Sequence, residues 1–237
     1  HTDAMTPACL LVIQHEPEAP IAWLGQWWAE RGIDVDVCRG DLDHPIPAHL
    51  DPQVHAGLVV LGGYMGANDD DEHAWLTPTK ALIRESIAAG IPFLGICLGH
   101  QLASVALGGL VGRNPAGRSL GAHPVLLTAA GESDPLLRGP NRRLAVHYND
   151  DIVLQAPPDA TVLAHGRGGE ILALRFGPRA WGLQFHPETS PEVFATWATE
   201  SDGAAFATAL AEVIDQRDHL ERSWRVLAER FPSPLTA

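Results

Sequence analysis

Residues 91–101 read IPFLGICLGHQ, an apolar run that ends at a cysteine held between two glycines. Residues 98–107 continue with helical periodicity, so Gly95-Ile96-Cys97-Leu98-Gly99 joins a buried strand directly to a helix. A nucleophile on so tight a turn needs glycine on both sides, because side chains there would clash. The stretch predicts a strand, a sharp turn and a helix, with Cys97 as a candidate nucleophile. For these five residues alone, a buried structural cysteine is an equal alternative.

Short apolar runs and helical segments alternate on both sides of this turn. We expect strands at residues 8–14, 33–37, 56–61 and 91–96. We expect helices over residues 19–31 and 98–107. A third helix should begin with Thr77 as its N-cap and Pro78 as its first residue, and should end at Gly90. Alternating strands and helices indicate an α/β fold with a mostly parallel, doubly wound, flavodoxin-like sheet.

The pattern of apolar runs and turn residues is different in the second half of the chain. Between residues 119 and 184 the apolar runs are shorter and are separated by Gly, Pro and Asp turns, which favours an added antiparallel or mixed strand layer. Apolar side chains then recur at three- and four-residue steps, at Leu210, Ile214, Leu220, Trp224 and Leu227. We expect a lead-in over 1–7, a domain over 8–199 and a helical extension over 200–237. Packing of that extension on the domain is preferred to a dimer or partner contact.

Composition and charge narrow the class of protein. With 29 acidic and 16 basic side chains among 237 residues, the net charge of −13 argues against nucleic acid as a partner. No run approaches the roughly 20 apolar residues of a membrane span, and residues 1–7 lack a targeting pattern, so we expect a cytoplasmic protein without a membrane partner. Cys9, Cys38 and Cys97 suit neither a disulfide framework nor a zinc site, and no metal or cofactor is expected.

A thiol nucleophile needs a base, and the base needs a group that orients it. Among the twelve histidines, His186 stands apart because it follows the apolar run 181–185 within Gln184-Phe185-His186-Pro187-Glu188. Past a strand end, a carboxylate two residues on can hold an imidazole. By itself this pattern is weak, and a surface turn is the simpler explanation.

Together, GICLGHQ at 95–101 and QFHPE at 184–188, in that order, resemble the class I glutamine amidotransferases. The nearest resemblance is to stand-alone, GMP-synthase-like domain proteins, and it covers about residues 8 to 199. It implies a catalytic set of Cys97, His186 and Glu188. In that family the loop Val60-Leu61-Gly62-Gly63-Tyr64-Met65 and the residue after the nucleophile supply the oxyanion hole, here the backbone N–H groups of Gly63 and Leu98.

The same resemblance implies a set of substrate-binding residues: Gly62, Gln101, Tyr148 and Asn149. Two departures concern the pocket. Tyr64 stands where many relatives have proline, and Tyr148-Asn149 replaces the Ser-His form of true GMP synthases.

Three functions follow from the resemblance. The first is hydrolysis of the glutamine side-chain amide through a glutamyl thioester, with ammonia supplied to a separate synthetase partner, since the sequence contains no phosphate-binding G-x-x-x-x-G-K-[ST] loop. The second is cleavage of other γ-glutamyl amides or peptides by the same thiol. The third is a non-enzymatic partner subunit, which the complete Cys-His-Glu set argues against.

Overall fold

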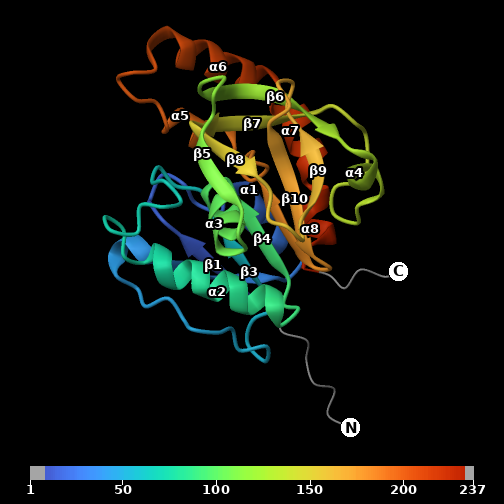
Figure 1. Ribbon diagram of the computed structural model, residues 1–237. Helices are drawn as coiled ribbons and strands as arrows, with labels where there is room; N and C mark the ends of the chain where they lie inside the picture. The colour runs from blue at the N-terminus through green and yellow to red at the C-terminus, as the bar shows by residue number, and fades with distance from the viewer. Residues whose placement is uncertain (1–8, 233–237) are drawn as a thin grey trace.

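Strand β1 (Cys9–Gln14) lies between parallel neighbours in the computed structural model, which describes residues 9–232 (Figure 1). Leu10 and Val12 belong to one core cluster, whereas Leu11 and Ile13 belong to the other. Because alternate side chains of a strand point to opposite faces, both faces of the sheet are covered. The expected doubly wound arrangement is confirmed; the expected lead-in at 1–7 lies outside the described residues.

The parallel part of the sheet has the order β2-β1-β3-β4-β11. Its other strands are β2 (Asp34–Arg39), β3 (Gly57–Val60), β4 (Phe93–Ile96) and β11 (Ala180–Leu183). Helices α2 (Leu76–Ala88) and α3 (Leu98–Ala106) cover one face, and α1 (Ala22–Ala29) covers the other. A short 3-10 helix, η1 (Gly40–Leu42), follows β2.

Two expected helix starts are wrong. Helix α1 begins at Ala22 rather than at residue 19, since Pro20 disfavours helical geometry in the residue before it. Helix α2 begins at Leu76 with Trp75 as its N-cap, and the hydroxyl of Thr77 instead donates to Oδ1 of Asp70 at 2.6 Å.

The sheet continues beyond β11 in antiparallel order as β10-β9-β6-β7, which confirms the added antiparallel layer. A side branch pairs β5 with β8, and β8 with β10. The elements of this part are β5 (Leu110–Arg113), β6 (Ser119–Leu127), α4 (Ala129–Ser133), β7 (Arg143–Asn149), β8 (Asp151–Gln155), β9 (Thr161–His165) and β10 (Ile171–Gly177).

The register between β4 and β11 brings two distant loops together. Ile96 pairs with Leu183 in parallel, so the residues that follow both strands leave the sheet at the same edge. Cys97 follows β4 and Gln184 follows β11. The turn that carries the candidate nucleophile therefore lies beside the segment that carries the candidate base.

Helical segments close the chain: α5 (Pro191–Ala195), α6 (Gly203–Asp215), α7 (Arg217–Trp224) and α8 (Val226–Arg230). Helix α6 lies against β6, α7 against β7 and α8 against α1 (Figure 1). Leu220, Trp224 and Leu227 are buried, but Ile214 is 56% exposed and does not belong to the packed stripe. No helix within residues 9–232 is long and apolar enough to cross a membrane.

Candidate active site

Steric contacts require both glycines that flank Cys97. A Cβ on Gly95 would lie 2.6 Å from the carbonyl carbon of Gly99, and a Cβ on Gly99 would overlap the carbonyl oxygen of Val60. Cys97 itself has a φ of 51°, a left-handed conformation that is strained for a residue with a side chain. Among the described residues Ala22, Asp43 and Arg142 also have a positive φ, but only Cys97 has it at the turn from β4 into α3.

Backbone hydrogen bonds fix that conformation. The N–H of Cys97 donates to the carbonyl of Leu183 on β11 at 2.7 Å, and the N–H of Gly99 donates to the carbonyl of Leu61 at 3.1 Å. Cys97 is the N-cap residue of α3. The positive end of the helix dipole at this place favours an anionic sulfur.

The side chains of His186 and Glu188 form a buried pair, with Nδ1 of His186 2.8 Å from Oε1 of Glu188. The backbone N–H of His186 donates to the carbonyl of Val146 at 2.8 Å, and the ring lies 4.6 Å from the ring of Trp197. Burial alone would lower the pKa of His186, but the negative charges of Glu188 and of a Cys97 thiolate outweigh burial and raise that pKa to about 10. The imidazole is thus held in the protonated form at neutral pH.

Gly62 lies where Cys97 and His186 approach one another. A Cβ at this position would be 3.0 Å from Cε1 of His186 and 3.4 Å from Cβ of Cys97. Gly62 therefore leaves room for the two side chains to meet, and it lines neither of the two cavities that meet at Cys97.

Gly63 and Leu98, the two expected oxyanion donors, are neighbours. A Cβ on Gly63 would lie 3.2 Å from Cδ2 of Leu98. Within residues 9–232 neither backbone N–H donates to a backbone carbonyl, and that of Leu98 has no partner inside its helix because it begins α3. Both donors are therefore left for another acceptor.

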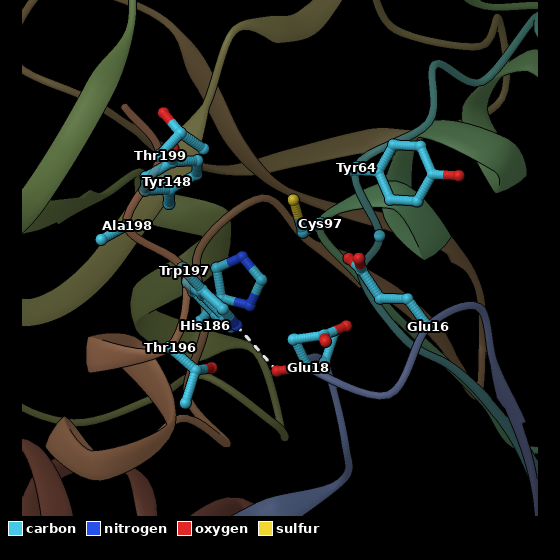
Figure 2. A pocket seen from close by; sticks show the side chains of 12 residues that line it. Glu16, Glu18, Tyr64, Cys97, Tyr148, His186, Thr196, Trp197, Ala198 and Thr199 are labelled. Carbon is cyan, nitrogen blue, oxygen red and sulfur yellow. Dashed lines mark hydrogen bonds between the residues drawn. The ribbon is translucent and has the colours of Figure 1, made fainter. Parts of the chain in front are cut away.

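Two cavities meet at Cys97, and both are bordered by Gly63, Tyr64, Cys97 and Tyr148. The imidazole cavity, about 320 Å³, is further lined by Glu16, Glu18, Ala19, His186 and residues 196–199 (Figure 2). The polar cavity, about 510 Å³, is further lined by residues 65–69, Gln101, residues 111–113 and residues 149–151. If a substrate occupied both cavities, the bond that joins its two halves would lie beside the Cys97 thiol.

The amide groups of the expected substrate-binding side chains are only partly engaged in hydrogen bonds within the protein. Nε2 of Gln101 donates to the carbonyl of Asp151 at 2.9 Å and to Oε1 of Gln184 at 3.2 Å. Nδ2 of Asn149 donates to the same Asp151 carbonyl at 3.0 Å, whereas its buried Oδ1 has no partner within residues 9–232. The amide oxygens of Gln101 and Asn149 are thus the groups left for a ligand.

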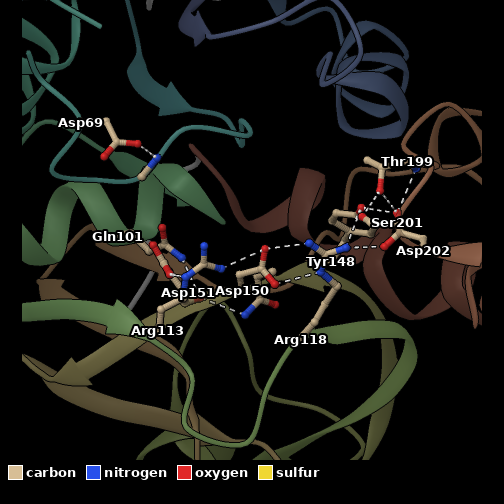
Figure 3. Close-up of polar contacts among 12 residues, drawn as sticks. Asp69, Gln101, Arg113, Arg118, Tyr148, Asp150, Asp151, Thr199, Ser201 and Asp202 are labelled. Atoms are coloured by element: carbon tan, nitrogen blue, oxygen red, sulfur yellow. Dashed lines mark hydrogen bonds and ion pairs between the residues drawn. The ribbon is translucent and has the colours of Figure 1, made fainter. Parts of the chain in front are cut away.

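Tyr148 borders both cavities with its ring, but its hydroxyl is already bound. It donates to Oδ2 of Asp202 at 2.7 Å, and Arg118 links Asp202 to Asp150 (Figure 3). The ring also stands edge-on to Phe194 and Trp197. Tyr148 therefore forms a fixed wall between the cavities.

Gln184 is the first residue of the Gln184–Glu188 motif, and the sequence assigns no role to it. Its side chain is completely buried, and Nε2 donates to Sγ of Cys97 at 3.6 Å. A buried amide needs hydrogen-bond partners, so a glutamine at the end of an apolar strand was the available signal. Glu16, Glu18 and Trp197 also line the site, and no local pattern marks them.

Within residues 9–232 no group of three or more His, Cys, Asp or Glu side chains is arranged to hold a metal ion. Cys9, Cys38 and Cys97 are all free thiols, and of these only Cys97 borders the two cavities.

Comparisons with known sequences and structures identify the family of the chain. The family model described as glutamine amidotransferase class-I matches residues 22–200. The glutamine amidotransferase-like protein YfeJ of Salmonella typhimurium is 29% identical over 231 residues, which cover 92% of this chain and 95% of that protein. Gamma-glutamyl peptidase 5 of Arabidopsis thaliana is 28% identical over 169 residues, covering 70% of this chain and 66% of that protein.

The crystal structure of a glutamine amidotransferase from Thermotoga maritima superposes with a TM-score of 0.82 at 25% identity, over 94% of this chain and 97% of that chain. The match of the family model spans most of the sequence. The chain therefore belongs to the class I glutamine amidotransferase family.

Proposed function

We propose that the protein hydrolyses the side-chain amide of glutamine through a glutamyl thioester on Cys97. Family membership supports glutamine hydrolysis to ammonia. The observation that carries the assignment of residues is the buried His186–Glu188 pair, because His186 borders the same cavity as the Cys97 thiol.

The reaction begins with attack of the Cys97 sulfur on the amide carbon. The oxyanion that forms is stabilised by the N–H groups of Gly63 and Leu98, a contribution of about 3–4 kcal/mol for each donor in well-studied cases. His186, oriented by Glu188, gives a proton to the nitrogen as the carbon–nitrogen bond breaks and ammonia leaves. The neutral imidazole then takes a proton from water, which attacks the thioester and releases glutamate.

The glutamyl head group would occupy the polar cavity. Arg113 lines this cavity together with the carboxylates of Asp69, Asp150 and Asp151, so both signs of charge are present for the α-carboxylate and α-ammonium groups. The amide oxygens of Gln101 and Asn149 add acceptors for the α-ammonium group.

The released ammonia would pass to an acceptor bound by a separate synthetase subunit, as the family name amidotransferase implies. We place this reaction in the cytoplasm. A second candidate function, hydrolysis of γ-glutamyl amides of larger amines, is favoured by the imidazole cavity, since about 320 Å³ exceeds the space that ammonia needs.

The test is release of ammonia and glutamate from glutamine by the purified chain. We expect Cys97→Ala to abolish turnover and to leave the far-UV circular dichroism unchanged. Cys38→Ala is the matched control, because Cys38 is also a buried, free cysteine but lies away from both cavities. Turnover by Cys97→Ala at the wild-type rate would remove Cys97 from the mechanism, and silence of the wild type toward every γ-glutamyl compound would favour a non-enzymatic partner role.

A further inference from the structure

The imidazole cavity lies on the side of the thiol from which a leaving group departs. His186, the proton donor of the proposed reaction, lines this cavity and does not line the polar cavity. With the glutamyl head in the polar cavity, the amine half of the scissile amide must point toward His186. The imidazole cavity is therefore the place of the leaving amine.

Its size suits an amine larger than ammonia. A small molecule such as water occupies about 30 Å³ in the liquid, and ammonia is similar in size. The cavity of about 320 Å³ leaves room for a chain of several carbon atoms beyond the nitrogen.

Its charge is one-sided. The positive charge of the His186 ring is offset by its partner Glu188, and the other charged side chains that line the cavity are the carboxylates of Glu16 and Glu18, with no lysine or arginine. Within residues 9–232 neither carboxylate makes an ion pair. Arg39, whose charge interacts with that of Glu18 at a distance, is paired with Asp41 at 2.5 Å. Burial and then the charge of Glu18 raise the pKa of the half-buried Glu16 to about 7, although the backbone of Tyr64 and the charge of His186 act in the opposite direction. A cation bound in the cavity would add a positive charge beside the two carboxylates.

Aromatic side chains form much of the remaining wall. Nε1 of Trp197 donates to the backbone carbonyl of Glu18 at 2.8 Å, which holds the indole beside both the carboxylates and the His186 ring (Figure 2). Tyr64 borders the cavity with 73% of its surface exposed. Aromatic faces beside carboxylates favour an alkyl chain that ends in an ammonium group.

We propose that the preferred substrates are γ-glutamyl amides of amines that carry a second, positively charged amino group, held by Glu16 and Glu18 in the imidazole cavity. This inference rests on the proposed function, because the same thiol must form the same γ-glutamyl thioester. The carbon–sulfur bond forms as the carbon–nitrogen bond breaks, His186 protonates the departing amine, and water then releases glutamate. The net reaction consumes one amide and one water and yields glutamate and the amine.

The experiment compares four substrates that share the γ-glutamyl group: glutamine, γ-glutamyl butylamide, the γ-glutamyl amide of diaminobutane and the γ-glutamyl amide of aminobutyrate. The butylamide is neutral, the diaminobutane amide is cationic and the aminobutyrate amide is anionic. We expect kcat/KM for the cationic amide to exceed that for the neutral amide by about tenfold or more, the effect of one well-placed opposite charge. We expect the anionic amide to be the poorest of the three.

The double variant Glu16→Gln with Glu18→Gln should bring the cationic-to-neutral ratio close to one. Because the ratio is taken within one variant, any change in the shared chemical step cancels. Glu85→Gln, on the exposed side of α2, is the control and should keep the wild-type ratio. A second measurement needs no variant of these glutamates: Cys97→Ala should bind the cationic amide more tightly than the neutral amide by the same factor.

Equal kcat/KM for the cationic and neutral amides, or a preference for the anionic amide, would overturn the inference. Hydrolysis of glutamine alone would also overturn it and would leave the proposed function standing. Absence of turnover with all four substrates would count against the proposed function itself, and the inference would fall with it.

Discussion

Nδ1 of His186 lies 2.8 Å from Oε1 of Glu188, and both side chains are almost completely buried. A β-bridge to Val146 fixes the backbone of His186. The backbone of Glu188 is fixed by the N–H of Trp23, which donates to the Glu188 carbonyl at 2.9 Å. The imidazole therefore presents its other nitrogen, Nε2, to the reaction.

Removal of the Glu188 charge should change the pH dependence of the reaction. The pKa of His186 is raised to about 10, against the effect of burial, by Glu188 and Cys97, so the imidazolium that protonates the leaving group persists to that pH and is lost above it. In Glu188→Gln burial still lowers the pKa while one of the two raising charges is gone, so the alkaline limb of kcat/KM should move to lower pH. We expect kcat to fall about 100- to 10,000-fold. The control is Glu192→Gln, because Glu192 is an exposed carboxylate on α5. This variant should keep the wild-type kcat and the wild-type pH dependence of kcat/KM.

Gln184 is predicted to act as a positioning residue for the thiol. Its Nε2 is a hydrogen-bond donor to Sγ of Cys97, and its Oε1 is fixed by Gln101. Gln184→Leu should lower kcat/KM about tenfold, the effect of one hydrogen bond to a charged group. It should also slow alkylation of Cys97 by iodoacetamide at neutral pH. A purely structural role would lower the melting temperature but leave the alkylation rate of the folded protein unchanged.

Substitution of Gly99 should disrupt the turn that carries Cys97. A Cβ there overlaps the Val60 carbonyl oxygen, which is backbone and cannot rotate away. We expect Gly99→Ala to lower the free energy of unfolding by more than about 3 kcal/mol in denaturant titrations, or to prevent folding. Gly177→Ala is the control, because a Cβ at Gly177 meets its neighbours at 3.6 Å and 3.9 Å, which are ordinary contact distances. Equal stability of the two variants would contradict the steric role assigned to Gly99.

Trp224 of α7 packs against the strand end that precedes His186, so its removal should affect stability. Its Nε1 donates to the carbonyl of Leu144 at 2.8 Å, and its ring lies 4.7 Å from that of Phe185, the residue before His186. Trp224→Ala should destabilise the protein by about 3–5 kcal/mol, because it leaves a large cavity in the core. The exposed Ile214→Ala should change stability by less than about 0.5 kcal/mol. A stable, fully active Trp224→Ala would show that α7 is dispensable for the core.

The sequence could predict those secondary-structure elements that are determined by residues close together in the chain. The turn at Cys97 depends on Gly95, Gly99 and two adjoining periodic segments, all within a few residues, and it appears where expected. Ile214 is exposed because α6 turns the row Phe206, Ala209 and Val213 to the core, whereas Leu210 and Ile214 form the adjacent apolar row. The four-residue spacing is the same in both rows and does not tell which of them is buried.

The walls of the site could not be predicted in the same way. Cys97 and His186 meet because β4 and β11 are neighbours, which a strand pattern alone does not specify. Glu16 and Trp197 come together from opposite ends of the domain, through the bond from Trp197 to the Glu18 carbonyl. The sequence does not predict that the amide nitrogen of Gln101 donates to Asp151 and Gln184, which leaves the amide oxygen for a ligand. Such hydrogen bonds depend on tertiary contacts.

The most direct measurement is identification of the covalent intermediate by peptide mass spectrometry. Wild-type protein would be mixed with glutamine, quenched in acid during turnover and digested. We predict a glutamyl adduct on the peptide that contains Cys97, its absence from Cys97→Ala, and its loss when hydroxylamine is added to give γ-glutamyl hydroxamate. Steady release of ammonia with no adduct on Cys97, or with the adduct on Cys9 or Cys38, would contradict the proposed mechanism.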